Sequence, residues 1–74
     1  MMDRHVYVAT MTKDGPKEYV LKCKTRWALT LPVARKVLGE KVQCILNYEH
    51  INWKSYCSLK DLEYIEAIEV DLDD

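Results

Sequence analysis

The sequence predicts a small α+β domain, in which an antiparallel sheet of four to five strands carries one main helix. Apolar and polar residues alternate with a period of two in several segments, as in strands with one buried face. The segment after Pro32 has the periodicity of a helix instead. The expected order is a β-hairpin, the helix, two strands, a short helix and a last strand. We expect one compact domain, 1–74, from the length of the chain. A chain of this length buries only about 60% of its unfolded surface, so its stability margin is thin.

The first hairpin is predicted from the alternating segment Tyr19–Leu31 and from the turn before it. Asp14-Gly15 is a pair favoured in tight hairpins, and a loop of either two or four residues places Thr12 opposite Lys17. That register gives one face of the hairpin to the core and leaves His5 on the solvent face. The residues predicted to be buried are Val6, Val8, Thr10, Tyr19, Leu21 and Cys23. Because the segment is long for a single strand, we expect a bend or break near residues 24–27.

The main helix is expected over Pro32–Leu38. Proline suits the first helical position, and the residue before a proline avoids the helical region, so Leu31 would be the last extended residue. In the alternative, Thr30 is the N-cap. Gly39 is the expected end of the helix, because glycine tolerates the left-handed conformation that often follows the last turn.

The second half of the chain is predicted to form two strands, a short helix and a last strand. Alternation recurs in Val42–Tyr48 and again in Ile51–Cys57, which we interpret as a second hairpin. Ser58 has the chemistry of a helix N-cap, and the apolar spacing after it predicts a short helix over Ser58–Tyr64. Alternation then returns in residues 67–72, the expected last strand.

Charge is divided along the chain. Residues 1–41 carry nine Lys or Arg and four Asp or Glu, a balance of +5, whereas residues 42–74 carry two and eight, a balance of −6. The division predicts either binding patches or pairing of the two halves inside one fold. Internal pairing would bring acidic residues of the last strand, Glu69 and Asp71, next to basic residues of the first hairpin, Lys22, Lys24 and Arg26.

No spacing in the sequence matches a catalytic, metal or nucleotide motif. His5 and His50 lack a neighbour that predicts a catalytic pair, and both are expected at the surface or in a loop. The three cysteines, Cys23, Cys44 and Cys57, lie in separate segments without a zinc-binding spacing, and we expect core cysteines in a reducing compartment. The sequence therefore predicts no enzymatic activity, no cofactor and no metal.

The function predicted instead is a small protein-protein interaction module, an inhibitor or regulator of a host enzyme as in phage or mobile-element proteins. Aromatic anchors and an acidic surface are typical of such contacts. The candidate protein-binding residues are Trp53, Tyr56, Tyr64, Glu66, Glu69 and Asp71. A core of this size also favours a homodimer. The N-terminus lacks the pattern of a signal peptide and the longest apolar run is Val6–Ala9, so we expect a cytoplasmic protein without a membrane segment.

The alternative is a nucleic-acid-binding regulator that uses basic residues of the hairpin and the helix. The candidate residues are Lys22, Lys24, Arg26, Arg35 and Lys36. A sequence pI near 6.1 opposes this alternative, because the net charge repels a polyanion at long range.

Residues 26–39 resemble part of the swapped-hairpin transcription factors of the AbrB type, in the strand, the proline, the helix and the pair Leu38-Gly39. Members of that family bind DNA as intertwined dimers, so the resemblance implies DNA binding. The proline-to-arginine spacing, Pro32 to Arg35, is shorter here by one residue, and the Gly-Asp that usually follows is missing after Gly39.

Overall fold

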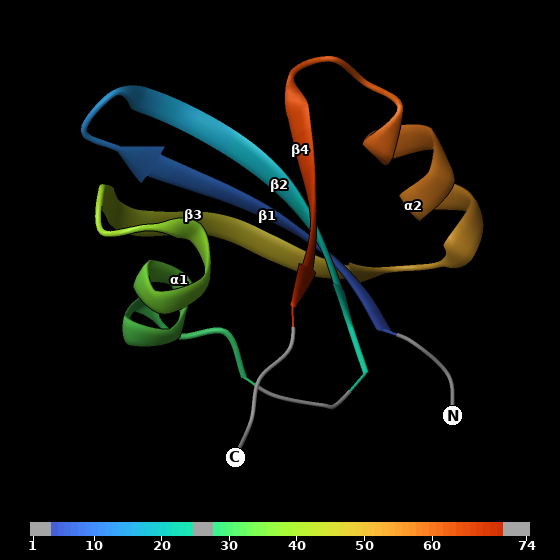
Figure 1. The fold of residues 1–74 in the computed structure, drawn as a ribbon, viewed down its shortest axis with the longest axis horizontal. Coiled ribbons are helices and arrows are strands. Elements are labelled where there is room, and N and C mark those ends of the chain that lie inside the picture. Colours follow the sequence, from blue (N-terminus) through green and yellow to red (C-terminus); the bar gives the residue numbers. More distant parts are fainter. Residues whose placement is uncertain (1–3, 25–27, 71–74) are drawn as a thin grey trace.

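The computed structural model describes residues 4–24 and 28–70, which form four strands and two helices. In chain order these are β1 (Arg4–Thr12), β2 (Gly15–Cys23), α1 (Leu31–Leu38), β3 (Val42–Ile51), α2 (Trp53–Lys60) and β4 (Ile65–Val70) (Figure 1). The strands form one sheet in the order β3-β1-β2-β4. β1 is antiparallel to both of its neighbours, whereas β4 is parallel to β2. The α+β class and the four strands are confirmed, and the sheet is mixed rather than wholly antiparallel.

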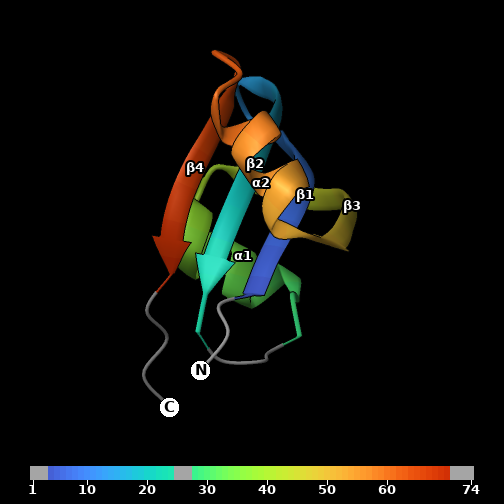
Figure 2. The ribbon, with the colours of Figure 1, turned by 90° about the vertical axis from the view of Figure 1, so that its right-hand side faces the viewer.

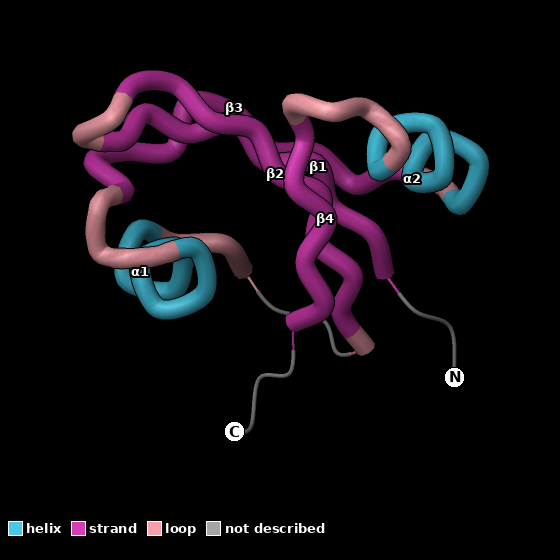
Figure 3. The backbone as a smooth tube through the Cα atoms, turned by 45° about the horizontal axis from the view of Figure 1, so that its top comes forward, coloured by secondary structure: helices cyan, strands magenta, loops and turns pink. Residues whose placement is uncertain are grey.

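Both helices lie in connections between parallel strands, because β3 has the same direction as β2 and β4. One connection leads from β2 through α1 to β3, and the other leads back across the sheet from β3 through α2 to β4. Connections of the same handedness that run in opposite directions place their helices on opposite faces. Figure 2 shows α2 in front of the sheet and α1 behind it. In Figures 1 and 3 the two helices also lie toward opposite ends of the long axis.

Each face of the sheet has its own core. The α1 face contains the larger cluster of buried residues, Val6, Val8, Tyr19, Leu21, Leu29, Ala34 and Val42. The α2 face contains Val20, Tyr56 and Ile65. Val20 is 0% exposed and His5 is 7% exposed. The prediction of a solvent face for β1 and β2 was therefore wrong: α2 covers that face, and His5 is buried beneath it.

The register of the first hairpin differs from the predicted one by two residues. Thr12 lies opposite Gly15 instead of Lys17, and Val8 lies opposite Tyr19. A shift of two leaves every side chain on its predicted face, so the expected core residues of the hairpin are buried all the same. β2 ends at Cys23, close to the expected break, and residues 25–27 of that prediction lie outside the described residues.

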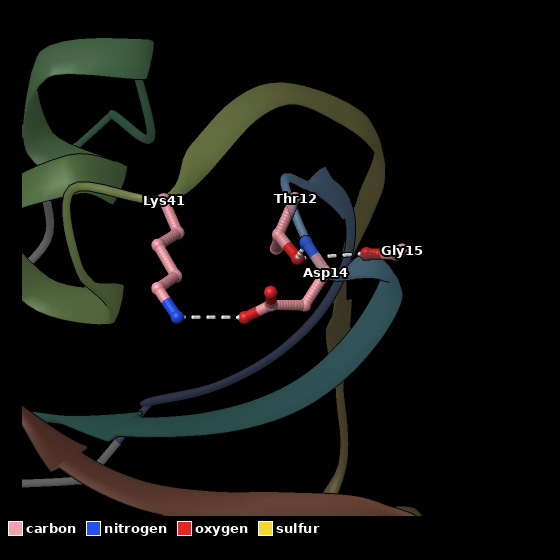
Figure 4. Close-up of polar contacts among 4 residues, drawn as sticks. All are labelled: Thr12, Asp14, Gly15 and Lys41. Atoms are coloured by element: carbon pink, nitrogen blue, oxygen red, sulfur yellow. Dashed lines mark hydrogen bonds and ion pairs between the residues drawn. The ribbon is translucent and has the colours of Figure 1, made fainter.

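The register follows from the chemistry of the turn (Figure 4). The Asp14 N–H donates to the Thr12 hydroxyl oxygen at 3.1 Å, and that hydroxyl donates to the Gly15 carbonyl at 2.8 Å. Gly15 has a φ of 111°, which a residue with a Cβ rarely adopts. Lys41 Nζ lies 2.9 Å from Asp14 Oδ2, and the Lys13 N–H donates to the Lys41 carbonyl at 3.0 Å. The contact with Lys41 lowers the pKa of Asp14 and attaches the turn to the start of β3.

The main helix agrees with its prediction to within one residue. α1 begins at Leu31, and Thr30 is the N-cap, as in the alternative assignment, although its side chain makes no capping hydrogen bond. Gly39 ends the helix with a φ of 119°, and its N–H donates to the Arg35 carbonyl at 3.1 Å. Arg35 Nε donates to the Val42 carbonyl at 2.9 Å and joins the helix to β3.

The predicted second hairpin was wrong. β3 continues without a turn to Ile51, and the next segment is the helix α2, which begins five residues before the predicted cap Ser58. Asn52 is the N-cap, because its side-chain oxygen accepts the Ser55 N–H at 2.8 Å. β4 begins at Ile65, slightly earlier than expected. Neither helix in 4–24 and 28–70 has the length and apolar character needed to cross a membrane.

Candidate protein-binding surface

A groove lies where β2 extends beyond the start of β4. β4 begins at Ile65, opposite Glu18, so the first residues of β2 have no β4 neighbour. The groove has a volume of about 480 Å³. It is lined by Pro16, Lys17, Glu18 and Tyr19 of β2, by Glu63 and Tyr64 of the loop before β4, and by Glu66 of β4. The register between β2 and β4 thus brings together residues that are more than 40 positions apart in the sequence.

The lining combines negative charge with an accessible aromatic ring. The lining includes three carboxylates and one cation: Glu18, Glu63 and Glu66, and Lys17. Tyr64 is 68% exposed, the largest exposed fraction among the large apolar side chains of the described residues. An exposed aromatic ring beside carboxylates suits the charge and the aliphatic stem of a lysine or arginine side chain.

Glu18 is fixed within the groove by a contact across the sheet. The Tyr7 hydroxyl donates a hydrogen bond to Glu18 Oε2. This bond, together with burial, raises the pKa of Tyr7 to about 12, because ionisation would place a phenolate against the carboxylate. Burial also raises the pKa of Tyr19, with a smaller contribution from the charge of Glu66. Each of these two tyrosines therefore stays neutral beside a glutamate of the groove lining.

The predicted protein-binding residues do not form one surface. Tyr64 and Glu66 line the groove, whereas Glu69 is directed to the opposite face of β4, because neighbouring residues alternate along a strand. Trp53 is 59% exposed at the start of α2. Tyr56 is only 7% exposed and packs in the core of the α2 face, so it is not available for surface contacts. Asp71 lies outside the described residues.

Trp53 and Tyr56 enclose His5. The His5 ring lies 4.2 Å from the Tyr56 ring and 5.4 Å from the Trp53 ring, centroid to centroid. Trp53 and Tyr56 are stacked at 5.5 Å, and Lys60 Nζ lies 5.6 Å from the Tyr56 centroid. The two ring contacts of His5 attach α2 to β1. The expectation of a surface position for His5 was wrong, whereas His50 is exposed on β3.

The basic residues of the nucleic-acid alternative are divided between the two faces. Lys22 shares the α2 face with Val20, and its Nζ lies 3.7 Å from Glu69 Oε1. Arg35 and Lys36 belong to α1, which covers the other face. Lys24 is exposed just after β2, and Arg26 lies outside the described residues. The helix and the strand therefore do not combine their charges on one face.

The three cysteines differ in exposure, and none of them is in a disulfide. Cys23 is buried and Cys57 is half-buried, but Cys44 is exposed on β3, so the expectation of a core position was wrong for Cys44. Among the described residues, no group of three or more His, Cys, Asp or Glu side chains is arranged to hold a metal ion.

Sequence reasoning found Tyr64 and Glu66 but missed Glu18, Tyr19 and Glu63. Their shared location depends on the register of β2 against β4, for which the sequence offers no local signal. Comparison of the chain with protein-family models, with curated proteins and with solved structures finds no match. The resemblance of residues 26–39 to swapped-hairpin transcription factors therefore has no support from a family model.

Proposed function

We propose that this chain is a non-enzymatic protein-binding module that recognises a basic segment of a partner protein. The observation that supports the proposal is the groove beside β4, whose lining contains three glutamates and an exposed tyrosine. A module of this kind would act by occupying a basic surface of its partner, as an inhibitor or regulator does. Three cysteines outside disulfides, one of them exposed, favour a reducing compartment such as the cytoplasm.

The unpaired edge of β4, next to the groove, favours an extended segment as the ligand. β4 is an edge strand, so half of its backbone N–H and C=O groups point away from β2. An extended peptide can pair with such an edge through its main chain and place alternate side chains in pockets. A lysine or arginine of that peptide would lie against Tyr64 between Glu63 and Glu66.

Titration calorimetry with a synthetic lysine- and arginine-rich peptide tests the proposal. We expect binding that weakens as salt is added, and no binding of a glutamate-rich peptide of the same length. The double variant Glu63→Gln/Glu66→Gln should bind the basic peptide more weakly. Glu40→Gln is the matched control, because Glu40 is exposed in the loop between α1 and β3. Equal affinity of the double variant and the control would reject the groove as the binding site.

Nucleic-acid binding is the weaker alternative, because the strand and helix cations lie on opposite faces and Lys22 contacts Glu69. A gel-shift experiment at low salt decides between the two. A mobility change that Arg35→Gln/Lys36→Gln abolishes would favour the nucleic-acid alternative over the protein-binding proposal.

Self-association is also part of the proposal. A chain of 74 residues has a small core, and association with a second copy is one way for such a chain to gain stability.

A further inference from the structure

The sheet has two open edges, and they differ in chemistry. β3 and β4 are the outer strands, and each pairs with one described strand only. Unpaired edges are sites where another strand can add, and charged side chains usually protect them. β4 carries Glu66 and Glu69, both exposed. Residues 42–48 of β3, in contrast, contain no charged side chain.

β3 is also the least covered element of the sheet. Seven of its ten residues are exposed, including Leu46 at 55% and Tyr48 at 43%. Valine, isoleucine and tyrosine favour the extended conformation, and an uncharged segment such as 42–48 at an edge tends to aggregate unless a partner covers it. β3 carries a single carboxylate, Glu49, so it can lie against its own copy in a register that keeps the two Glu49 side chains apart, whereas β4 carries two exposed carboxylates.

We propose that β3 pairs antiparallel with β3 of a second copy, which joins two sheets into one of eight strands. This inference rests on the self-association part of the proposed function and is independent of the groove. A twofold axis between antiparallel edge strands is perpendicular to the sheet, so residues of the same parity face each other. The register against β1 shifts between Ala9 and Thr10 and again between Met11 and Thr12, which leaves Asn47–Ile51 as the regular part of β3.

Charge excludes one position of the axis within this regular part, and the side chains favour another. An axis at Glu49 would oppose two carboxylates. An axis at Tyr48 instead brings the two tyrosine rings together and places the Asn47 amide of each copy opposite Glu49 of the other, where the amide can donate to the carboxylate. Leu46, at the register shift next to this part, then lies beside His50 of the other copy. This arrangement opposes no like charges and covers the exposed side chains of Leu46 and Tyr48.

Sedimentation equilibrium over a range of concentrations tests the dimer. We expect the wild type to approach twice the 8.7 kDa mass of the chain. A residue on the twofold axis meets its own copy, so Tyr48→Lys and Tyr48→Glu should both weaken dimerisation, by at least about tenfold, although they change the charge in opposite directions. Tyr48→Phe should retain the dimer. Leu62→Lys, at an exposed side chain in the loop between α2 and β4, is the matched control and should also remain dimeric.

The outcomes separate the interface from self-association itself. A wild type that sediments at the mass of one chain at every concentration would reject self-association. A dimer that survives both charged substitutions of Tyr48 would retain self-association but overturn the β3 interface. Circular dichroism of the charged variants shows that they are folded, and Leu46→Lys provides a second disruption at a side chain that is 55% exposed. Basic-peptide binding should be the same in Tyr48→Lys and wild type, which keeps this test separate from that of the groove.

Discussion

Lys22 and Glu69 are direct neighbours across the parallel pair of β2 and β4, with Lys22 Nζ 3.7 Å from Glu69 Oε1. The pair confirms the expectation that the acidic last strand lies beside the basic first hairpin. Part of the charge division along the chain is therefore neutralised inside the fold. The Lys22 side chain is 28% exposed and that of Glu69 is 83% exposed, so the pair is strongly screened by solvent.

Reversal of one charge in this pair should destabilise the fold modestly. Lys22→Glu places two carboxylates side by side, which should cost about 0.5–1 kcal/mol and lower Tm by about 2–8 °C. The double variant Lys22→Glu/Glu69→Lys should recover most of the loss. Lys24→Glu is the control, because Lys24 is exposed beyond the end of β2. Thermal unfolding that shows the same Tm for Lys22→Glu and wild type would contradict a structural role for the pair.

The start of α2 is the position where the sequence was most misleading. Residues 51–57 alternate as a strand would, but Asn52 caps a helix that begins at Trp53. The alternating apolar residues do not share a buried face, because α2 buries only Tyr56 and leaves Trp53 exposed. Asn52 was the available signal: an asparagine can cap a helix, and its side chain accepts the Ser55 N–H three residues later.

Substitution of the two competing caps tests this assignment. Asn52→Ala should lower the free energy of unfolding by about 1 kcal/mol, because it leaves the Ser55 N–H without its acceptor. Ser58→Ala should have almost no effect, because Ser58 is exposed within α2. Urea denaturation followed by circular dichroism measures both. The opposite order of the two effects would place the helix start at Ser58.

Local patterns predicted the hairpin, its α1 face and α1 itself, because each depends on neighbouring residues. Thr12 and Gly15 still shifted the register by two, through hydrogen bonds that the pair Asp14-Gly15 alone does not reveal. The second core could not be predicted in this way. It exists because α2 returns across the sheet, and that path depends on the order of the strands rather than on any one segment. The groove likewise depends on the order of the strands, which places β4 beside β2.

Substitution of Val20 measures how much the core of the α2 face contributes to the stability of the fold. It is 0% exposed and packs with Tyr56 and Ile65, on the face that alternation assigned to solvent. Val20→Ala should lower the free energy of unfolding by about 2 kcal/mol, similar to Val8→Ala on the α1 face. Both substitutions are measured by urea denaturation. A loss close to zero for Val20→Ala, with a full loss for Val8→Ala, would mean that α2 does not cover the sheet.

Tyr7 should titrate at unusually high pH. Its pKa is raised from 10.0 to about 12, first by the hydrogen bond to Glu18 and then by burial. Since the unfolded chain releases this proton near pH 10.0 and the folded chain retains it, the contribution of Tyr7 to stability is complete below pH 10.0 and is lost as the pH rises to about 12. In Tyr7→Phe, the alkaline loss of stability should accordingly be smaller than in the wild type.

Glu18→Gln separates the effect of the hydrogen bond to Glu18 on the pKa of Tyr7 from the effect of the charge of Glu18. The amide can still accept the hydrogen bond but carries no charge, so the pKa of Tyr7 should fall while the tyrosine stays in place. Glu66→Gln is the control, because Glu66 raises the pKa of Tyr19 rather than that of Tyr7. Phenolate absorbance, recorded with circular dichroism to confirm that the chain is folded, follows each titration. If the pKa of the highest-titrating tyrosine is unchanged in Glu18→Gln, the charge of Glu18 does not raise the pKa of Tyr7.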